Sequence, residues 1–250
     1  MGDWVNRRGT GAGSWHTLAV RFVLIRHGQS GNNLIFATTG GEAGRHPDTP
    51  LTELGHDQAR RLAESVAAGV LPWSVTHVYC SLMRRAVQTA APLADALDLD
   101  LHGHAELFEC GAPYDLDEDG NRVAHPGSGR DELAALTPRL RLPDAAGQGG
   151  WWSGPYEAEE RAWSERAHRV IAGLRATHAH DDVVALVTHA YFTQFLLRAL
   201  LGIGSMGGWF NIKNTAISLV RDEIAPAWVG TTTAERINWI PHLAVEHYTD

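Results

Sequence analysis

Short apolar runs alternate along this chain with longer segments in which apolar residues recur at helical spacing. The apolar run at 182–188 is typical of a parallel strand that is covered by helices on both faces. We expect further strands at 21–25, 76–80 and 215–220, with 237–240 as an edge strand. This alternation predicts an α/β fold, a three-layer sandwich with a mostly parallel central sheet flanked by helices.

Four helices are expected between these strands. Thr52 and Ser81 are predicted N-caps of two of them, and Pro92 is expected to kink the second. A third helix is expected to begin at Gly154 with Pro155 in its first turn, and a fourth covers 191–201. The segment 33–50 is rich in Gly, Thr, Asp and Pro, so it is predicted to be a loop.

The middle of the chain, about residues 100–155, is different in kind. It has few periodic runs and many glycines, prolines and acidic residues, so we interpret it as a loop-rich insertion over the active-site edge of the sheet. We predict one domain over 18–250, which includes this insertion, and a flexible segment at 1–17 before it.

Charge and cysteine content limit the partners. The 250 residues carry a formal net charge of −8, which argues against a nucleic-acid or anionic-membrane surface. No apolar run is long enough for a membrane span, no secretory signal precedes residue 18, and the two cysteines fit reduced thiols. A cytoplasmic location is therefore expected, and a homodimer is left open.

Cationic side chains follow three of the predicted strands. Arg26 and His27 follow the first, Arg84 and Arg85 follow the second, and His189 follows the third. The carboxyl ends of neighbouring parallel strands share one sheet edge, where helix N-termini also favour anions. Buried cations repel each other unless an anion lies between them, so this pattern indicates a phosphate site.

Four ordered motifs resemble those of the histidine phosphatase superfamily, which is phosphoglycerate mutase-like, and of its phosphatase branch in particular. The chain has an Arg-His-Gly motif at 26–28 with Ser30 and Asn33, a DTPLTELGHDQA run at 48–59, an SLMRRAVQTA helix start at 81–90, and an apolar strand that ends at His189.

The resemblance implies a role for each matching residue. His27 is the expected nucleophile, and Arg26, Arg85 and His189 would complete the phosphate pocket. Arg84 is the less favoured of the arginine pair. Ser30, Asn33, Thr39 and Gly40 are expected to bind substrate. His27 must attack as a neutral imidazole, and the flanking arginines are expected to hold its pKa down.

A carboxylic acid is needed to protonate the leaving group. The family supplies it from an L-x-E pattern, which Leu107-Phe108-Glu109 matches. Glu109 is therefore the expected acid and Glu106 the alternative, because Pro113 replaces a glycine that many relatives carry. No metal and no cofactor are expected, and His102-Gly103-His104 is interpreted as a solvated loop rather than a metal pair.

The insertion is expected to select the substrate. Trp151 and Trp152 would either stack on a sugar or base or close the insertion onto the core. Arg130 and Arg139, with His125 and Arg141, would either meet a second anionic group or lie on a charged exterior. The sequence does not decide between these alternatives.

The expected function is a phosphomonoesterase that acts on a small phosphorylated metabolite. A phosphoglycerate-type mutase is the alternative, but Gln29 replaces the glutamate that mutases carry, and 109–113 lacks their signature. A non-catalytic phospho-ligand binding protein is the second alternative, although it typically lacks a catalytic histidine or arginine, and none is missing here.

Overall fold

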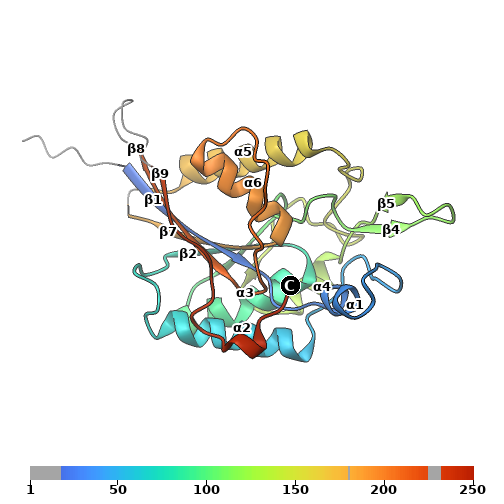
Figure 1. The fold of residues 1–250 in the computed structure, drawn as a ribbon, viewed down its shortest axis with the longest axis horizontal. Helices are drawn as coiled ribbons and strands as arrows, with labels where there is room; N and C mark the ends of the chain where they lie inside the picture. Colours follow the sequence, from blue (N-terminus) through green and yellow to red (C-terminus); the bar gives the residue numbers. More distant parts are fainter. Residues whose placement is uncertain (1–17, 180, 225–231) are drawn as a thin grey trace, which may run out of the picture.

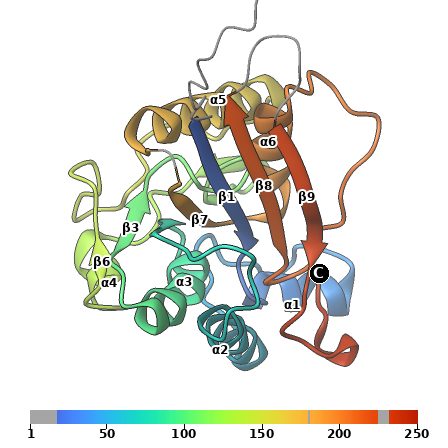
Figure 2. The same cartoon turned by 90° about the vertical axis from the view of Figure 1, so that its left-hand side faces the viewer.

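Strand β1 (Leu18–Arg26) lies in the interior of a seven-stranded sheet in the computed structural model, which describes residues 18–179, 181–224 and 232–250. The sheet order is β6-β3-β2-β7-β1-β8-β9. The strands β2 (His77–Ser81), β3 (Leu101–His104), β6 (Leu140–Arg141) and β7 (Val183–Thr188) extend the sheet from β1 with parallel pairing. β8 (Ile217–Ile224) and β9 (Thr232–Trp239) complete it on the other side with antiparallel pairing (Figure 2).

Helices cover both faces of this sheet (Figure 1). α2 (Glu53–Ala67) and α3 (Arg84–Leu97) pack on one face, and α5 (Glu160–Thr177) and α6 (Ala190–Leu201) pack on the other. β1 alternates between the two cores, since Val23 and Ile25 face α2 and α3 while Phe22 and Leu24 face α5 and α6. The predicted three-layer α/β fold with a mostly parallel sheet is therefore confirmed.

The smaller elements gather beyond the carboxyl end of β1. These are α1 (Gly31–Thr39), α4 (Arg130–Ala134) and the hairpin of β4 (Tyr114–Leu116) and β5 (Arg122–Ala124), which projects from the body of the molecule (Figure 1). The 3₁₀ turn η1 (Val245–His247) lies near the end of the chain. The predicted flexible segment at 1–17 lies outside the described residues.

Several predicted boundaries were wrong. Residues 33–39 of the predicted loop belong to helix α1, because Ser30 caps the helix and accepts the N–H of Asn33. Ser81 ends β2 instead of capping α3, whose N-cap is Met83. α5 begins at Glu160 rather than at Gly154.

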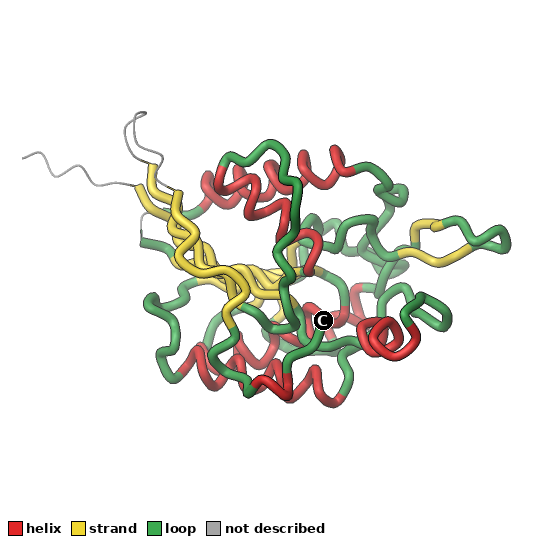
Figure 3. The backbone as a smooth tube through the Cα atoms, viewed as in Figure 1, coloured by secondary structure: helices red, strands yellow, loops and turns green. Residues whose placement is uncertain are grey.

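The insertion contributes more regular structure than its composition predicts (Figure 3). Residues 101–104 and 140–141 form two strands of the central sheet, so His102 and His104 lie in β3 and not in a loop. Strands of four and two residues are too short to produce a periodic signal. In the part of the chain that the structure describes, no helix is both long and apolar enough to cross a membrane.

Candidate active site

The site lies where three neighbouring parallel strands end. β2, β7 and β1 are adjacent in the sheet and end at Ser81, Thr188 and Arg26, so His27 and His189 follow directly at the same edge. The two imidazole centroids are 5.0 Å apart. The structure therefore brings together the strand ends that the sequence analysis singled out.

His27 is held in one tautomer by its two hydrogen bonds. Its Nδ1 lies 2.6 Å from the carbonyl oxygen of Gly28, and its Nε2 lies 3.1 Å from Nε of Arg85. A carbonyl can only accept a hydrogen bond and a guanidinium can only donate one. Nδ1 therefore carries the proton, and the Nε2 lone pair is directed toward Arg85.

The two arginines have N–H groups without a partner. Arg26 donates from Nη1 to the carbonyl of Ile212 at 2.6 Å, and Arg85 donates from Nη2 to the sulfur of Met83 at 3.4 Å. Nε of Arg26 and Nη1 of Arg85 are buried and have no hydrogen-bond partner among the described residues. Buried donors of this kind are costly when unsatisfied, so these N–H groups are available to bind an anion.

His189 stands beside this pair and is fully buried. Its Nε2 lies 2.8 Å from the hydroxyl oxygen of Ser81, while its Nδ1 has no partner among the described residues. The residue is also the N-cap of α6, so the positive end of the helix dipole lies at the site.

Burial and positive charge keep both histidines neutral. Burial lowers the pKa of His27 well below its usual value of 6.5, and the charges of Arg85 and Arg26 lower it further. The pKa of His189 is lowered well below 6.5 by burial and by Arg85. Burial also lowers the pKa of Arg26 to about 10, which leaves this guanidinium charged at neutral pH.

The second motif supports the loop that carries His27. A side-chain carbon on Gly28 would lie 2.6 Å from the carbonyl oxygen of Gly55, and one on Gly55 would lie 2.0 Å from that of Gln29. The backbones pass this closely because neither glycine has a side chain. The amide oxygen of Gln58 accepts the N–H of Gln29 at 2.8 Å, and Thr52 caps α2 while bonding Gln29.

Ser30 and Asn33 form the start of α1 near the pocket. Ser30 donates from its backbone N–H and its hydroxyl to Oδ1 of Asn33 at 3.1 and 2.9 Å. The Nδ2 of Asn214 bonds both this oxygen, at 3.4 Å, and the carbonyl of His27, at 2.9 Å. Asn214 is thus a link between α1 and His27 that was not predicted from the sequence.

Thr39 and Gly40 lie at the exposed far end of α1. The hydroxyl of Thr39 donates to the carbonyl of Ile35 at 2.8 Å, and Gly40 ends the helix in the left-handed conformation with φ 71°. The hydrogen bonds that the two residues form with described parts of the chain are local ones, and their role in substrate binding stays a prediction.

The two candidate acids have different surroundings. The carboxylate of Glu109 accepts the N–H groups of Phe192 and Tyr191 in the first turn of α6, at 2.9 and 3.3 Å, and that of Cys110 at 2.9 Å. Its charge acts on both Arg26 and Arg85. Glu106 instead forms an exposed ion pair with Arg169 at 2.7 Å. The structure therefore places Glu109, and not Glu106, close enough to Arg26 and Arg85 to act on their charges.

A buried arginine fixes the segment that carries Glu109. Arg166 of α5 lies between the rings of Phe108 and Phe192, 3.6 and 3.9 Å from their centroids, and pairs with Glu157 at 3.0 Å. It also donates to the carbonyls of Glu106 and Phe108, each at 2.8 Å. Glu157, which precedes the start of α5 at Glu160, is thus the ion-pair partner of Arg166.

Three further residues near Arg85 were not predicted. Asp48 accepts the first N–H of α3 from Arg84 at 2.8 Å and the hydroxyl of Ser128 at 2.9 Å, and its charge acts on Arg85. Arg45 lies 3.6 Å from the ring centroid of Tyr114, and both act electrostatically on Arg85. Arg45 comes from a segment that looked like an ordinary polar loop, so the sequence contained no signal for it.

The tryptophans and the other arginines of the insertion contact residues outside the candidate site. Trp151 is buried against Phe108, with centroids 5.6 Å apart, and Trp152 packs on the same ring at 4.5 Å. These tryptophans close the insertion onto the core. Arg139 pairs with Asp95 and Asp98, Arg141 pairs with Asp100, and Arg130 donates to the carbonyl of Pro143.

Sequence and structure comparisons agree on the class of protein. The family model of the histidine phosphatase superfamily (branch 1) matches residues 22–225. The chain therefore belongs to this superfamily, and it is an enzyme of that class. It is similar to a probable phosphoglycerate mutase of Proteus mirabilis, with 26% identity over 233 residues that cover 91% of this chain and 94% of that protein.

Solved structures share the fold. The phosphoserine phosphatase of Entamoeba histolytica aligns with a TM-score of 0.57 at 19% identity, over 90% of this chain and all of that one (100%). A mycobacterial glucosyl-3-phosphoglycerate phosphatase aligns with a TM-score of 0.55 at 22% identity, over 88% and 99% of the two chains.

Proposed function

We propose that this chain is a phosphomonoesterase that hydrolyses a small phosphorylated metabolite through a phosphohistidine on His27. The observation that carries the proposal is the unprotonated Nε2 of His27 beside buried arginine N–H groups that have no partner among the described residues. A neutral nucleophile inside a cationic pocket is what attack on a dianionic phosphate requires.

In the first step, Nε2 of His27 attacks phosphorus and the bond to the ester oxygen breaks. Arg26, Arg85 and His189 face the phosphoryl oxygens, on which charge is spread in the transition state. Arg85 transfers its Nε hydrogen bond from His27 to one of these oxygens. The protonated form of Glu109 gives its proton to the departing alkoxide, so the alcohol leaves neutral and Glu109 becomes a carboxylate.

In the second step, water attacks the phosphohistidine. The Glu109 carboxylate takes a proton from this water, the N–P bond breaks, and inorganic phosphate leaves with His27 restored. The positive charge in this scheme comes from protein side chains, so we propose that hydrolysis needs no added metal or cofactor.

Arg45 suggests which phosphate esters are preferred. Its guanidinium lies close enough to Arg85 to lower the pKa of that residue, so the positive potential extends from the phosphate pocket toward Tyr114. We expect substrates with a second anionic group, such as a carboxylate, to bind better than neutral alkyl phosphates. The cytoplasmic location and the homodimer stay predictions.

The test is release of inorganic phosphate from a panel of alkyl, sugar, amino-acid and glycerate phosphates, with and without EDTA. We expect turnover in both conditions and a decrease of at least ~10³-fold in kcat for His27→Ala, which is about 4 kcal/mol of barrier. Acid-labile labelling of the wild-type chain by a phosphate ester, absent in His27→Ala, would identify the phosphohistidine.

The same panel separates the alternatives. Interconversion of 2- and 3-phosphoglycerate without phosphate release would identify a mutase, the activity named for the Proteus relative. Tight binding of phosphate esters without turnover would identify a non-catalytic binding protein. Substantial turnover by His27→Ala would show that the nucleophile is another residue.

A further inference from the structure

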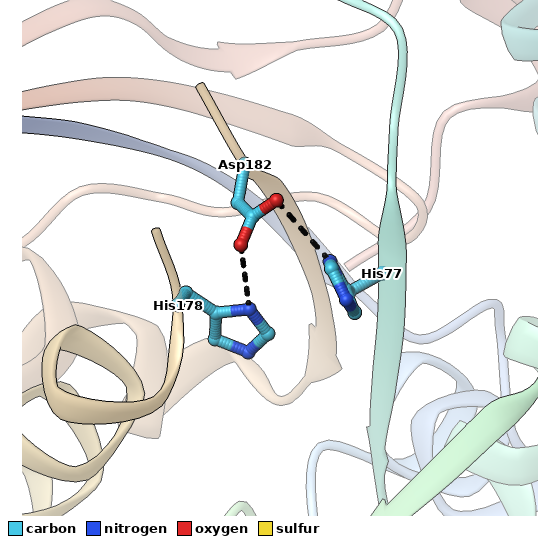
Figure 4. Close-up of side chains that lie close together, drawn as sticks. All are labelled: His77, His178 and Asp182. Carbon is cyan, nitrogen blue, oxygen red and sulfur yellow. Dashed lines mark hydrogen bonds and ion pairs between the residues drawn. The ribbon is translucent and has the colours of Figure 1, made fainter. Parts of the chain in front are cut away.

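A second cluster of ionisable side chains lies at the amino ends of the strands, opposite the ends where His27 lies. His77 opens β2, Asp182 directly precedes β7, and His178 is the C-cap of α5 (Figure 4). The site described above lies at the carboxyl ends of β2 and β7, whereas this cluster lies at their amino ends. The proposed phosphatase mechanism does not use it.

The spacing of the three side chains suits a metal ion. One ligand atom from each residue lies within 4.8 Å of the others. Nδ1 of His178 is 3.3 Å from Oδ2 of Asp182, and Nδ1 of His77 is 4.0 Å from Oδ1. Tetrahedral zinc, with bonds of about 2.0–2.1 Å, places its ligand atoms about 3.3 Å apart. The ligand atoms of His178 and Asp182 already have this spacing. A small rotation of the His77 side chain would bring its Nδ1 close enough to be the third ligand atom.

The groups around the cluster hold two of its members in place. The hydroxyl of Tyr79 lies 3.1 Å from Nε2 of His178, so the ligand atom is Nδ1, which would exchange its hydrogen bond to Oδ2 of Asp182 for the metal. Oδ2 of Asp182 accepts the N–H of Ala179 at 2.9 Å. Hydrogen bonds of this kind orient metal ligands and fix the histidine tautomer. His77 would exchange its contact with the hydroxyl of Thr76, at 2.9 Å, for the metal.

The cluster is also accessible to an ion. The side chains of His77 and Asp182 are 36% and 24% exposed, which gives an ion a route from solvent.

We propose that His77, His178 and Asp182 bind a divalent transition-metal ion of the Zn²⁺ class, with water in the fourth position. Two imidazoles and one carboxylate are a donor set that such ions favour over Mg²⁺ or Ca²⁺. The ion would tie His178 at the end of α5 and Asp182 just before β7 to the start of β2. Its role is structural, because it is separated from the phosphate pocket by the length of the strands.

The experiment is titration of the EDTA-treated, tag-free full chain with Zn²⁺, measured by calorimetry and by Tm. We expect one ion per chain and a rise in Tm. His77→Ala removes a partly exposed ligand at the first position of a strand, and Asp182→Asn is isosteric, so each should fold and bind Zn²⁺ at least about tenfold more weakly. Phosphatase activity serves as the check that the variants are folded.

Two matched variants complete the test. His56→Ala removes an exposed histidine of α2 and should bind Zn²⁺ like the wild type. His102→Ala removes a neighbour of Tyr79 that is outside the proposed set, and should also leave binding unchanged. The proposal is overturned by a wild type that binds no ion, by equal binding in His77→Ala, or by a loss in His102→Ala alone.

Discussion

The Nε–H of Arg85 donates a hydrogen bond to Nε2 of His27 over 3.1 Å. In the proposed mechanism the acceptor nitrogen attacks phosphorus, and the donor belongs to a group that binds a phosphoryl oxygen. Gly28 fixes the other side of the ring through its carbonyl. In that mechanism the attacking nitrogen and a phosphate-binding guanidinium are already adjacent, which reduces the reorganisation that the reaction requires.

Arg85→Lys is expected to lower kcat/KM about 10²-fold, or about 2.7 kcal/mol. Lysine keeps the charge, but it lacks the planar set of N–H groups that can bond His27 and phosphate together. Steady-state kinetics on the best substrate of the panel measures the effect. The matched control is Arg84→Lys in the adjacent position, for which we expect a change of less than about threefold. Equal losses in both variants would contradict the assignment of Arg85.

Glu109→Gln is expected to slow hydrolysis according to the leaving group. For an alkyl phosphate we expect kcat to fall by about 10²- to 10⁴-fold, because the alkoxide loses its proton donor. For p-nitrophenyl phosphate the decrease should be much smaller, because nitrophenolate leaves without protonation. Glu106→Gln, which removes only an exposed ion pair with Arg169, should change neither rate. An equal loss for both substrates would exclude Glu109 as the acid.

His242 is expected to make the protein less stable in acid. Burial lowers its pKa from 6.5 to about 4 in the folded state. Between these values the unfolded chain binds a proton and the folded chain does not, so the free energy of unfolding falls as the pH falls from 6.5 to 4. Below pH 4 this contribution is constant.

In His242→Gln the loss of stability over this range should be about 2 to 3 kcal/mol smaller than in the wild type. The amide of glutamine can still donate to the hydroxyl oxygen of Thr215, which His242 contacts at 2.9 Å. Urea unfolding at several pH values measures the difference. The exposed His56 provides the control, since His56→Gln should follow the wild-type curve. Parallel curves for His242→Gln and the wild type would refute the prediction.

Arg166→Met is expected to lower the free energy of unfolding by about 3 to 5 kcal/mol, because it leaves the carboxylate of Glu157 buried without a partner. Its side chain is 1% exposed and that of Glu157 is 13% exposed. The double variant Arg166→Met/Glu157→Gln should recover part of this loss, because the uncompensated charge is gone. Urea denaturation gives the values.

Arg169→Met removes an exposed arginine from the same helix and should cost less than about 1 kcal/mol. Similar losses for Arg166→Met and Arg169→Met would show that the buried pair contributes no more than a surface pair. The Arg166 variant should also lose activity, because that side chain holds the carbonyls on either side of Leu107, next to Glu109.

The sequence predicted the parts of the fold that produce strong local signals. The apolar runs that became β1 and β7, and the helical spacing of α2, were sufficient for the α/β class and for the sheet edge that holds the site. Helix α1 was missed because it depends on the reciprocal bonds of Ser30 and Asn33 rather than on apolar periodicity. The start of α5 was misplaced because Gly154 and Pro155 resemble a helix start but are followed by irregular chain up to Glu159.

The sequence by itself determined which side chains the proposed mechanism uses, because Arg26, His27, Arg85 and His189 follow strands whose parallel order places them at one end of the sheet. Only the tertiary structure decided the protonation of these side chains and the contacts that hold them in place. It fixed the tautomer of His27 and placed Glu109 on the N-terminus of α6. It also brought Arg45 and Asp48 to Arg85 and joined His77 to His178. These relationships join segments distant in the chain, and their energies depend on burial and distance, which no local pattern of residues encodes.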